Sequence, residues 1–247
     1  MNKKVALVTG GARGLGKNIV LELAQSGYAV VINYNASENL AKQLKKQLDN
    51  LKVENLIVKC DISCEAEVKQ MVNEAINKFG KIDVLVNNAA VSIDKMFFER
   101  TVEDFKTTLN TNVIGTFLVS KYVGETMYNN KSGKIINISS TNGINTYYPM
   151  CIDYDASKAA IISLTHNLAT QFSPYVIVNA IAPGFIATES EIGGMEPEFI
   201  KQEEQKIMVG RVGQPNEVAH LVSFLASDKA NFINNTVIKI DGGIYGD

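Results

Sequence analysis

The sequence predicts an α/β fold in which a parallel sheet of seven strands is covered by helices on both faces, in a doubly wound arrangement. Three observations support this. Short runs rich in Val and Ile alternate with longer segments, those segments carry apolar residues at three- and four-residue spacing, and no linker or internal repeat interrupts the chain. We therefore expect one domain over residues 1–247, in which 46% hydrophobic residues supply a sizeable core.

The strands are expected at the short apolar runs. These fall at 4–8, 29–32, 55–59, 83–87, 134–138, 176–181 and 236–240. Helical spacing is clearest at 15–27, 39–48 and 66–80, and another helix is expected from Pro215 to Ala226. Ser37 and Ser63 are the expected N-caps of the second and third helices. Residues 186–212 are polar and glycine-rich, so we expect a surface insertion or lid there.

Charge and composition exclude several classes of function. The net charge is -2 and no run of Lys or Arg resembles a nucleic-acid or membrane footprint, so neither partner is expected. The first apolar run, VALV, is too short for a signal peptide and no later run could span a membrane, which predicts a soluble cytoplasmic protein. The three cysteines lack metal or disulfide spacing, and His166 and His220 are expected on helices without carboxylate partners, so no metal is expected.

A glycine-rich turn follows the first expected strand. The stretch TGGARGLG at 9–16 places Gly10, Gly14 and Gly16 where a strand gives way to a helix. Glycine permits positive φ and close backbone approach there, and the free N–H groups of a helix N-terminus attract a pyrophosphate. The turn, with Arg13 and Leu15 in it, therefore predicts a dinucleotide site of the Rossmann type.

The end of the second strand indicates which nicotinamide cofactor is used. NAD enzymes usually place a carboxylate there, about twenty residues after the glycines, to bind the ribose 2′-hydroxyl. This chain reads INYNAS, in which Asn33, Asn35 and Ser37 offer no carboxylate, and Glu38 is expected one turn into the following helix. Arg13 could reach a 2′-phosphate. The sequence therefore predicts NADP(H).

Seven motifs in order resemble the short-chain dehydrogenase/reductase family over nearly the whole chain. They are TGGARGLG, CDI at 60–62, NNAA at 87–90, NVIG at 112–115, ISS at 138–140, YDASK at 154–158 and PGFIAT at 183–188. The resemblance implies cofactor contacts from Asp61 and Ile62 at the adenine, from Asn88, Ala89 and Ala90 along the nicotinamide half, and from Pro183, Gly184, Ile186 and Thr188 at the carboxamide end. Ala90 stands where the family usually has glycine.

Tyr154 and Lys158 are four residues apart, so they share one face of a helix and an ammonium can lie beneath a phenol. A free tyrosine with a pKa near 10 is about one part in a thousand ionised at pH 7. One positive charge at roughly 5 Å is worth about 3 kcal/mol, or about two pKa units. We therefore expect Tyr154 to be the proton donor to a substrate carbonyl, with Lys158 tuning it and also binding the nicotinamide ribose.

The family resemblance adds two further catalytic residues. Ser140 is expected to hydrogen-bond the substrate oxygen, and Asn112 to hold a water that links Lys158 to solvent. Ser139 is the alternative to Ser140. Ser140 is the better fit, because the family serine lies about thirteen residues before the tyrosine. Tyr147 and Tyr148 are alternatives to Tyr154, but neither has a lysine four residues later.

Five further stretches indicate a group within the family: SIDKMFFERT at 92–101, NTNVIGTFLVSK at 110–121, VNAIAPGFIAT at 178–188, GRVGQPNEVA at 210–219 and DGG at 241–243. With them, the chain most resembles the 3-oxoacyl-acyl-carrier-protein reductases of fatty acid synthesis. The resemblance implies an NADPH-dependent reductase of a 3-oxoacyl thioester, an acyl carrier protein as a possible partner, and a homotetramer. An acidic carrier protein needs positive charge near the site, for which Lys95, Arg100 and Lys131 are candidates. The alternatives are a reductase of another small ketone or sugar, and a regulator that senses NADPH without turnover.

Overall fold

The structure, a computed structural model, describes residues 3–145, 148–188 and 193–245. Its strands form one seven-stranded sheet in the order β3-β2-β1-β4-β5-β6-β7, and every neighbouring pair is parallel. The strands are β1 (Val5–Val8), β2 (Ala29–Tyr34), β3 (Asn55–Lys59), β4 (Val84–Asn87), β5 (Gly133–Ile138), β6 (Val176–Pro183) and β7 (Val237–Ile240). The predicted fold class is confirmed, with each strand within one or two residues of its expected position.

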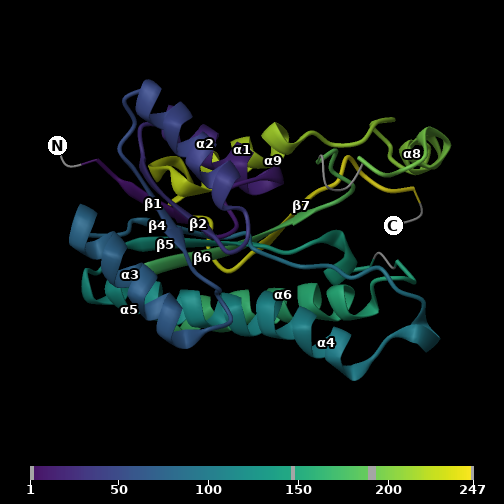
Figure 1. Cartoon of the computed structure of the whole chain (residues 1–247), viewed down its shortest axis with the longest axis horizontal. Helices are drawn as coiled ribbons and strands as arrows, with labels where there is room; N and C mark the ends of the chain where they lie inside the picture. The colour runs from purple at the N-terminus through teal and green to yellow at the C-terminus, as the bar shows by residue number, and fades with distance from the viewer. Residues whose placement is uncertain (1–2, 146–147, 189–192, 246–247) are drawn as a thin grey trace.

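Helices cover both faces of the sheet, as Figure 1 shows. One face carries α1 (Gly14–Gln25), α2 (Glu38–Asn50) and α9 (Pro215–Ala226). The other carries α3 (Glu65–Phe79), α5 (Thr116–Asn129) and α6 (Ile152–Gln171). Two further helices are α4 (Val102–Leu109), which runs directly into a π-helical turn at Asn110–Gly115, and α8 (Pro197–Glu204).

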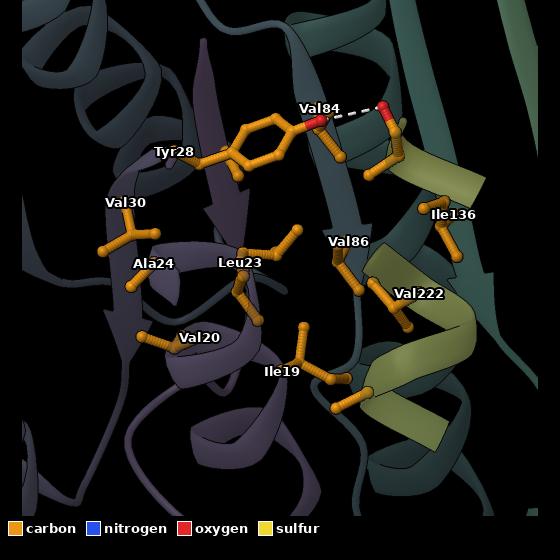
Figure 2. Close-up of a cluster of buried hydrophobic side chains, with 14 of the residues drawn as sticks. Ile19, Val20, Leu23, Ala24, Tyr28, Val30, Val84, Val86, Ile136 and Val222 are labelled. Carbon is orange, nitrogen blue, oxygen red and sulfur yellow. Dashed lines mark hydrogen bonds between the residues drawn. The ribbon is translucent and has the colours of Figure 1, made fainter. Parts of the chain in front are cut away.

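The core consists of two apolar layers, one on each side of the sheet. Strand residues alternate between them, so that Leu7 and Val31 face α3 and α5 while Val8 and Ile32 face α1 and α9. Tyr28 lies in the layer between the sheet and helices α1 and α9, at the amino-terminal edge of the sheet. Its buried hydroxyl donates a 2.9 Å hydrogen bond to the carbonyl of Ala226 (Figure 2). Burial raises the pKa of Tyr28 to about 12, so its hydroxyl stays a donor across the physiological range.

The strand order positions a binding crevice. The chain builds outward from β1 to β3 in one direction and from β4 to β7 in the other, so the connections that leave β1 and β4 diverge. A crevice forms at the carboxyl ends of strands where the order reverses in this way. The glycine-rich turn after β1 lies at this point.

Several sequence-based expectations differ from the structure. Ser63 is not an N-cap, because α3 begins at Glu65 and Cys64 occupies the cap position. Ser37 does precede α2, but its side chain makes no capping hydrogen bond. Glu38 is the first residue of α2 and not one turn inside it. His220 has a carboxylate neighbour after all, since its Nε2 lies 3.6 Å from Oε2 of Glu22.

The segment at 186–212 is only partly irregular within its described residues. It contains α8 and is tied to the rest of the chain by two isolated bridges, from Ile186 to Gly213 and from Ile207 to Ile244. Among the residues that the structure describes, no helix is long and apolar enough to span a membrane. The same residues hold no group of three or more His, Cys, Asp or Glu side chains that could bind a metal ion.

Candidate functional site

A cleft of about 430 Å³ lies at the carboxyl ends of the central strands. Every residue expected from the sequence to contact the cofactor lines it. These are Gly10, Arg13, Gly14, Leu15, Gly16, Asn33, Asn35, Ser37, Asp61, Ile62, Asn88, Ala89, Ala90, Tyr154, Lys158, Pro183, Gly184, Ile186 and Thr188. Segments separated by more than a hundred residues thus meet in one crevice.

The turn between β1 and α1 requires glycine at three positions, for two different reasons. Gly10 and Gly14 have φ of 60° and 53°, which favours glycine. A Cβ on Gly16 would lie 2.2 Å from the carbonyl oxygen of Gly10, so only a hydrogen fits there. The first turn of α1 therefore lies close to β1, with its free N–H groups at the cleft. This arrangement fits a pyrophosphate.

The end of β4 is fixed against the same turn by side-chain hydrogen bonds. The Thr9 hydroxyl oxygen accepts from the backbone N–H groups of Asn88 and Ala89, at 2.9 and 3.0 Å. In return, Nδ2 of Asn88 donates to the carbonyl of Thr9 at 2.9 Å. The two walls of the cleft are therefore held at a fixed spacing. Ala90, the departure from the family glycine, is solvent-exposed and lines the cleft.

Asn33 supports the cleft wall from within the protein. Its side chain is 2% exposed, its Oδ1 accepts from the Gly10 N–H at 3.1 Å, and its Nδ2 donates to the Cys60 carbonyl at 2.9 Å. Both polar atoms are therefore used to join β2 to the glycine turn and to the end of β3. The groups left to face an adenosine ribose are those of the exposed residues Arg13 and Asn35 and the half-buried Ser37.

The charge around the adenosine end is set by a few residues. Asp61 supplies the one carboxylate among the described lining residues, and its Oδ1 accepts from the backbone N–H and the hydroxyl of Ser63 at 2.9 and 2.7 Å. Glu38 lies nearby in sequence but pairs with Lys42 at 2.6 Å. A hydrogen bond and the charge of Lys42 lower the pKa of Glu38, and the charge of Lys59 adds to this.

Tyr154 and Lys158 lie one turn apart on α6. The Lys158 Nζ is 5.3 Å from the centroid of the Tyr154 ring and donates a 2.8 Å hydrogen bond to the carbonyl of Ile138, at the end of β5. Lys158 is 3% exposed, and this burial lowers the pKa of its ammonium to about 8. The lysine is therefore still about nine-tenths protonated at pH 7.

Two serines follow β5, and their hydrogen bonds distinguish them. The Ser139 hydroxyl is buried and donates to the carbonyl of Lys158 at 2.8 Å, which joins β5 to α6. The Ser140 hydroxyl accepts from the Asn142 backbone N–H at 3.2 Å and donates to Asn142 Oδ1 at a long 3.4 Å. Of the two serines, Ser140 is thus the one whose hydroxyl donates only a weak hydrogen bond within the protein.

The side chain of Asn112 does not line the cleft, although its neighbour Thr111 does. Asn112 is 1% exposed and lies in the π-helical turn between α4 and α5. Its Oδ1 accepts from the Val91 N–H at 2.8 Å, while its Nδ2 donates to the Val91 carbonyl at 2.9 Å and to the Ser157 hydroxyl at 2.9 Å. The Asn112 side chain therefore fixes the segment after β4 against α6.

The three residues expected to attract an acidic carrier protein are not an exposed cluster. Arg100 is wrong as a docking residue, because its side chain is 4% exposed and pairs with Asp153 at 2.6 Å. Lys131 precedes β5 and so lies at the amino-terminal edge of the sheet, opposite the cleft. Lys95 is on the cleft side but pairs with Asp104 at 2.7 Å.

Some functional features were missed from the sequence. Thr9, which joins β1 to the end of β4, lies within the glycine motif, but no pattern marks its hydroxyl as an anchor. Ala36 lies at the cleft and belongs to the INYNAS stretch. Asp153 and Asp155 flank Tyr154 within DYDASK, and their partners become visible only in the folded chain. Tyr147, an alternative to Tyr154, lies outside the described residues, while Tyr148 is 38% exposed and does not line the cleft.

Comparisons with known proteins agree with this geometry. A family model described as enoyl-(acyl carrier protein) reductase matches residues 10–245. A 3-oxoacyl-[acyl-carrier-protein] reductase of Staphylococcus epidermidis is 36% identical, with 99% of this chain and 100% of the relative covered. The 3-oxoacyl-[acyl-carrier-protein] reductase of Synechocystis is 38% identical, with 99% and 98% covered.

Solved structures give the same result. A short-chain dehydrogenase/reductase from Serratia marcescens has a TM-score of 0.91 at 34% identity and covers 97% of each chain. A dehydrogenase/reductase from Sinorhizobium meliloti has a TM-score of 0.91 at 28% identity, with 98% and 95% covered. From the fold, the cleft and this near-complete likeness, the chain belongs to the short-chain dehydrogenase/reductase family of oxidoreductases.

Proposed function

We propose that the protein is an NADPH-dependent reductase that converts a ketone to an alcohol, with a 3-oxoacyl thioester as its substrate. The observation that carries this proposal is the buried Lys158 ammonium beneath the Tyr154 ring, in the same cleft as Ser140 and the glycine-rich turn. A phosphate turn alone would serve a binding protein equally well. A phenol over a buried ammonium, in one cleft with a hydroxyl donor, has a use in proton transfer.

Each residue has a separate role in the proposed reaction. NADPH, when bound, supplies the hydride that adds to the carbonyl carbon. Tyr154 donates its phenolic proton to the carbonyl oxygen as negative charge develops there, and Ser140 donates a hydrogen bond to the same oxygen. Lys158 stabilises the phenolate that Tyr154 becomes, because its positive charge lies one helical turn away. Asn112 holds the segment after β4 in place, and this is the role that we propose for its side chain.

The preference for NADPH is supported by the charge near Ser37. No carboxylate from the described residues lines the cleft at positions 35–37, whereas the exposed guanidinium of Arg13 does line it. A ribose 2′-phosphate bound there would meet the cation Arg13, and positions 35–37 themselves add no like charge. Glu38 weakens this argument little, because Lys42 already neutralises it.

The thioester substrate is supported by the relatives, several of which are named as 3-oxoacyl-[acyl-carrier-protein] reductases and match nearly full length. The family model carries a different description, an enoyl reductase, in which a carbon–carbon double bond would be reduced. A phenol that protonates oxygen suits the ketone better. Docking of an acyl carrier protein, the homotetramer, the cytoplasmic location, the single domain and the lid at 186–212 remain predictions.

The test is NADPH oxidation by the purified protein with acetoacetyl-CoA, a short 3-oxoacyl thioester. Parallel reactions use NADH, crotonyl-CoA as an enoyl thioester, and a panel of small ketones and sugars. Reduction of acetoacetyl-CoA with NADPH at least about tenfold faster than with NADH supports both parts of the proposal.

Other outcomes select among the alternatives. Faster reduction of crotonyl-CoA would replace the ketone by an enoyl substrate, and turnover of a panel ketone alone would retain the chemistry but discard the thioester. Tight NADPH binding with no turnover of any carbonyl would contradict the enzyme and favour a sensor of the reduced cofactor.

A further inference from the structure

The carboxylate of Asp155, the residue after Tyr154, is connected to the Ser140 hydroxyl through one side chain. Nδ2 of Asn142 donates a 2.7 Å hydrogen bond to Oδ1 of Asp155. The other end of the same amide, Oδ1 of Asn142, lies 3.4 Å from the Ser140 Oγ, which donates to it. Asp155 and Asn142 are not among the described residues that line the cleft, and Ser140 is the lining residue to which these hydrogen bonds lead.

The carboxylate fixes which way the Asn142 amide faces. An ionised carboxylate only accepts hydrogen bonds, so it must meet the NH₂ end of the amide and never its oxygen. The amide oxygen of Asn142 is therefore turned toward Ser140. Without Asp155, the amide loses the partner that fixes its position beside Ser140.

Backbone packing holds these groups at a fixed spacing. Asn142 lies in the short 3-10 helix Thr141–Gly143, whose last residue packs against α6. A Cβ on Gly143 would lie 2.6 Å from the carbonyl carbon of Lys158, so the two backbones are in close contact. The second oxygen of Asp155 also accepts from the Tyr148 N–H at 3.3 Å, so one carboxylate contacts the β5–α6 connection at both ends.

The direction of the Ser140 proton follows from these contacts. The Asn142 backbone N–H donates to the Ser140 Oγ at 3.2 Å, which leaves the hydroxyl hydrogen on the side of the Asn142 oxygen. That outgoing bond is long and weak, so a substrate oxygen in the cleft competes for the proton at little cost. The network therefore holds the Ser140 oxygen in place and leaves its hydrogen in a weak bond that a substrate oxygen can replace.

We propose that Asp155 and Asn142 are positioning residues, which hold the Ser140 hydroxyl in place and in a weak bond that the carbonyl oxygen of the substrate replaces. The inference rests on the proposed carbonyl reduction but not on the choice of thioester. It gives a role to the carboxylate of Asp155, which takes no part in the proposed reaction itself.

A double-mutant cycle tests the proposal, using whichever carbonyl of the panel the native protein reduces fastest. The variants are Ser140→Ala, Asp155→Ala, Asp155→Asn and the double variant Ser140→Ala with Asp155→Ala. Asn167→Ala is the matched control, because Asn167 is an exposed residue of the same helix whose Nδ2 bonds only locally, to the Ser163 carbonyl. NADPH affinity and thermal stability are measured for every variant.

We expect Ser140→Ala to lower kcat by about 10²-fold or more, as for the loss of one oxyanion donor. Asp155→Ala should lower kcat about tenfold, with NADPH affinity unchanged within about twofold, as for coupled neighbours. Asp155→Asn should retain most of kcat, since an amide oxygen can still accept from Nδ2 of Asn142. The double variant should match Ser140→Ala within about twofold, because the proposal has Asp155 act on the substrate through Ser140.

The opposite results overturn the inference. If the Asp155→Ala loss multiplies with that of Ser140→Ala, or if Asp155→Ala alone leaves kcat unchanged, Asp155 does not act through Ser140. The native protein separates this failure from failure of the proposed substrate, because preference for another ketone changes the substrate and leaves the cycle intact. Absence of carbonyl reduction by the native protein would overturn the proposed function and this inference together.

Discussion

The buried ammonium of Lys158 lies 5.3 Å from the ring centroid of Tyr154 and donates to the carbonyl of Ile138. Burial lowers the pKa of Lys158 to about 8, so its charge is present at neutral pH and is lost on moderate alkalisation. The two facts make the cleft pH-sensitive, because one protonation state of Lys158 stabilises a phenolate and the other does not.

The first prediction concerns this pH dependence. Because the charged form of Lys158 predominates below its pKa, kcat/KM for carbonyl reduction should be greatest below about pH 8 and fall above it. The midpoint belongs to the coupled Tyr154 and Lys158 pair. Initial rates from pH 6 to pH 10 at constant ionic strength check this, and a flat profile to pH 10 would remove the lysine charge from the account.

The free energy of unfolding should change with pH in the opposite direction to the rate. In the folded protein the pKa of Lys158 is about 8, below its ordinary value of 10.5. Below about pH 8 the folded state therefore carries a buried charge, which lowers the free energy of unfolding. Between about pH 8 and pH 10.5 the unfolded chain binds the extra proton, and the native state gains stability as pH rises. Urea unfolding of Lys158→Met, compared with the native protein over this range, should lack that gain.

A second prediction concerns the glycine turn. Gly16→Ala places a methyl group 2.2 Å from the Gly10 carbonyl oxygen and 2.6 Å from Nδ2 of Asn88, so the turn must shift. An overpacked position costs about 1–3 kcal/mol, and NADPH affinity should fall at least about tenfold. Gly194→Ala is the control, since no atom of the described residues beyond its two chain neighbours lies within 4 Å of its added Cβ. Fluorescence titration with NADPH measures both, and equal affinities would contradict the close approach.

A third prediction concerns cofactor choice. Ala36→Asp adds a carboxylate at an exposed position of the cleft lining, where it would repel a ribose 2′-phosphate. NADPH affinity should fall about tenfold while NADH affinity changes less than about threefold. Asn33 is a poorer choice for this test, because a carboxylate there would face the Cys60 carbonyl with no hydrogen to donate. An equal loss for both cofactors would contradict the phosphate argument.

The control for this variant is Asn130→Asp, which makes the same charge change at the exposed end of α5, at the far edge of the sheet. It should leave the affinities for both cofactors unchanged. A fall there would show that net charge alone, and not the position of the carboxylate, weakens binding.

The fourth prediction concerns the Arg100–Asp153 ion pair, whose side chains are 4% and 0% exposed. Arg100→Met leaves the buried Asp153 carboxylate without its cation, with the Thr108 hydroxyl, at 2.6 Å, as a neutral partner. Loss of one member of a buried pair costs about 3–5 kcal/mol. Lys4→Met, which breaks the exposed pair with Asp228, should cost less than about 1 kcal/mol. Urea denaturation measures both free energies of unfolding, and similar values would contradict the buried pair's importance.

Much of the cleft could be predicted from the sequence, because its residues follow directly after strands. Parallel strands end at one edge, so residues that follow them meet there, and four-residue spacing on a helix is enough to bring Tyr154 and Lys158 together. The same reasoning could have excluded Lys131, which precedes β5 and therefore lies at the opposite edge.

The remainder depends on contacts between distant parts of the chain. Arg100 resembles a surface cation in sequence, and only its pairing with Asp153, fifty-three positions later, buries it. Asn112 looked like a cleft residue, but its side chain is directed to Val91 and Ser157 from within a π-helical turn. No sequence periodicity predicts that irregular turn or the direction of a side chain in it.

The central claim is that Tyr154 donates the proton in an NADPH-dependent carbonyl reduction. Tyr154→Phe keeps the ring above Lys158 and removes only the hydroxyl. The most direct measurement is therefore NADPH consumption with acetoacetyl-CoA by this variant and by the native protein, at equal NADPH saturation. The account predicts that kcat falls by about 10²–10⁴-fold while NADPH affinity changes less than about threefold. Turnover by Tyr154→Phe within about threefold of the native rate would contradict it.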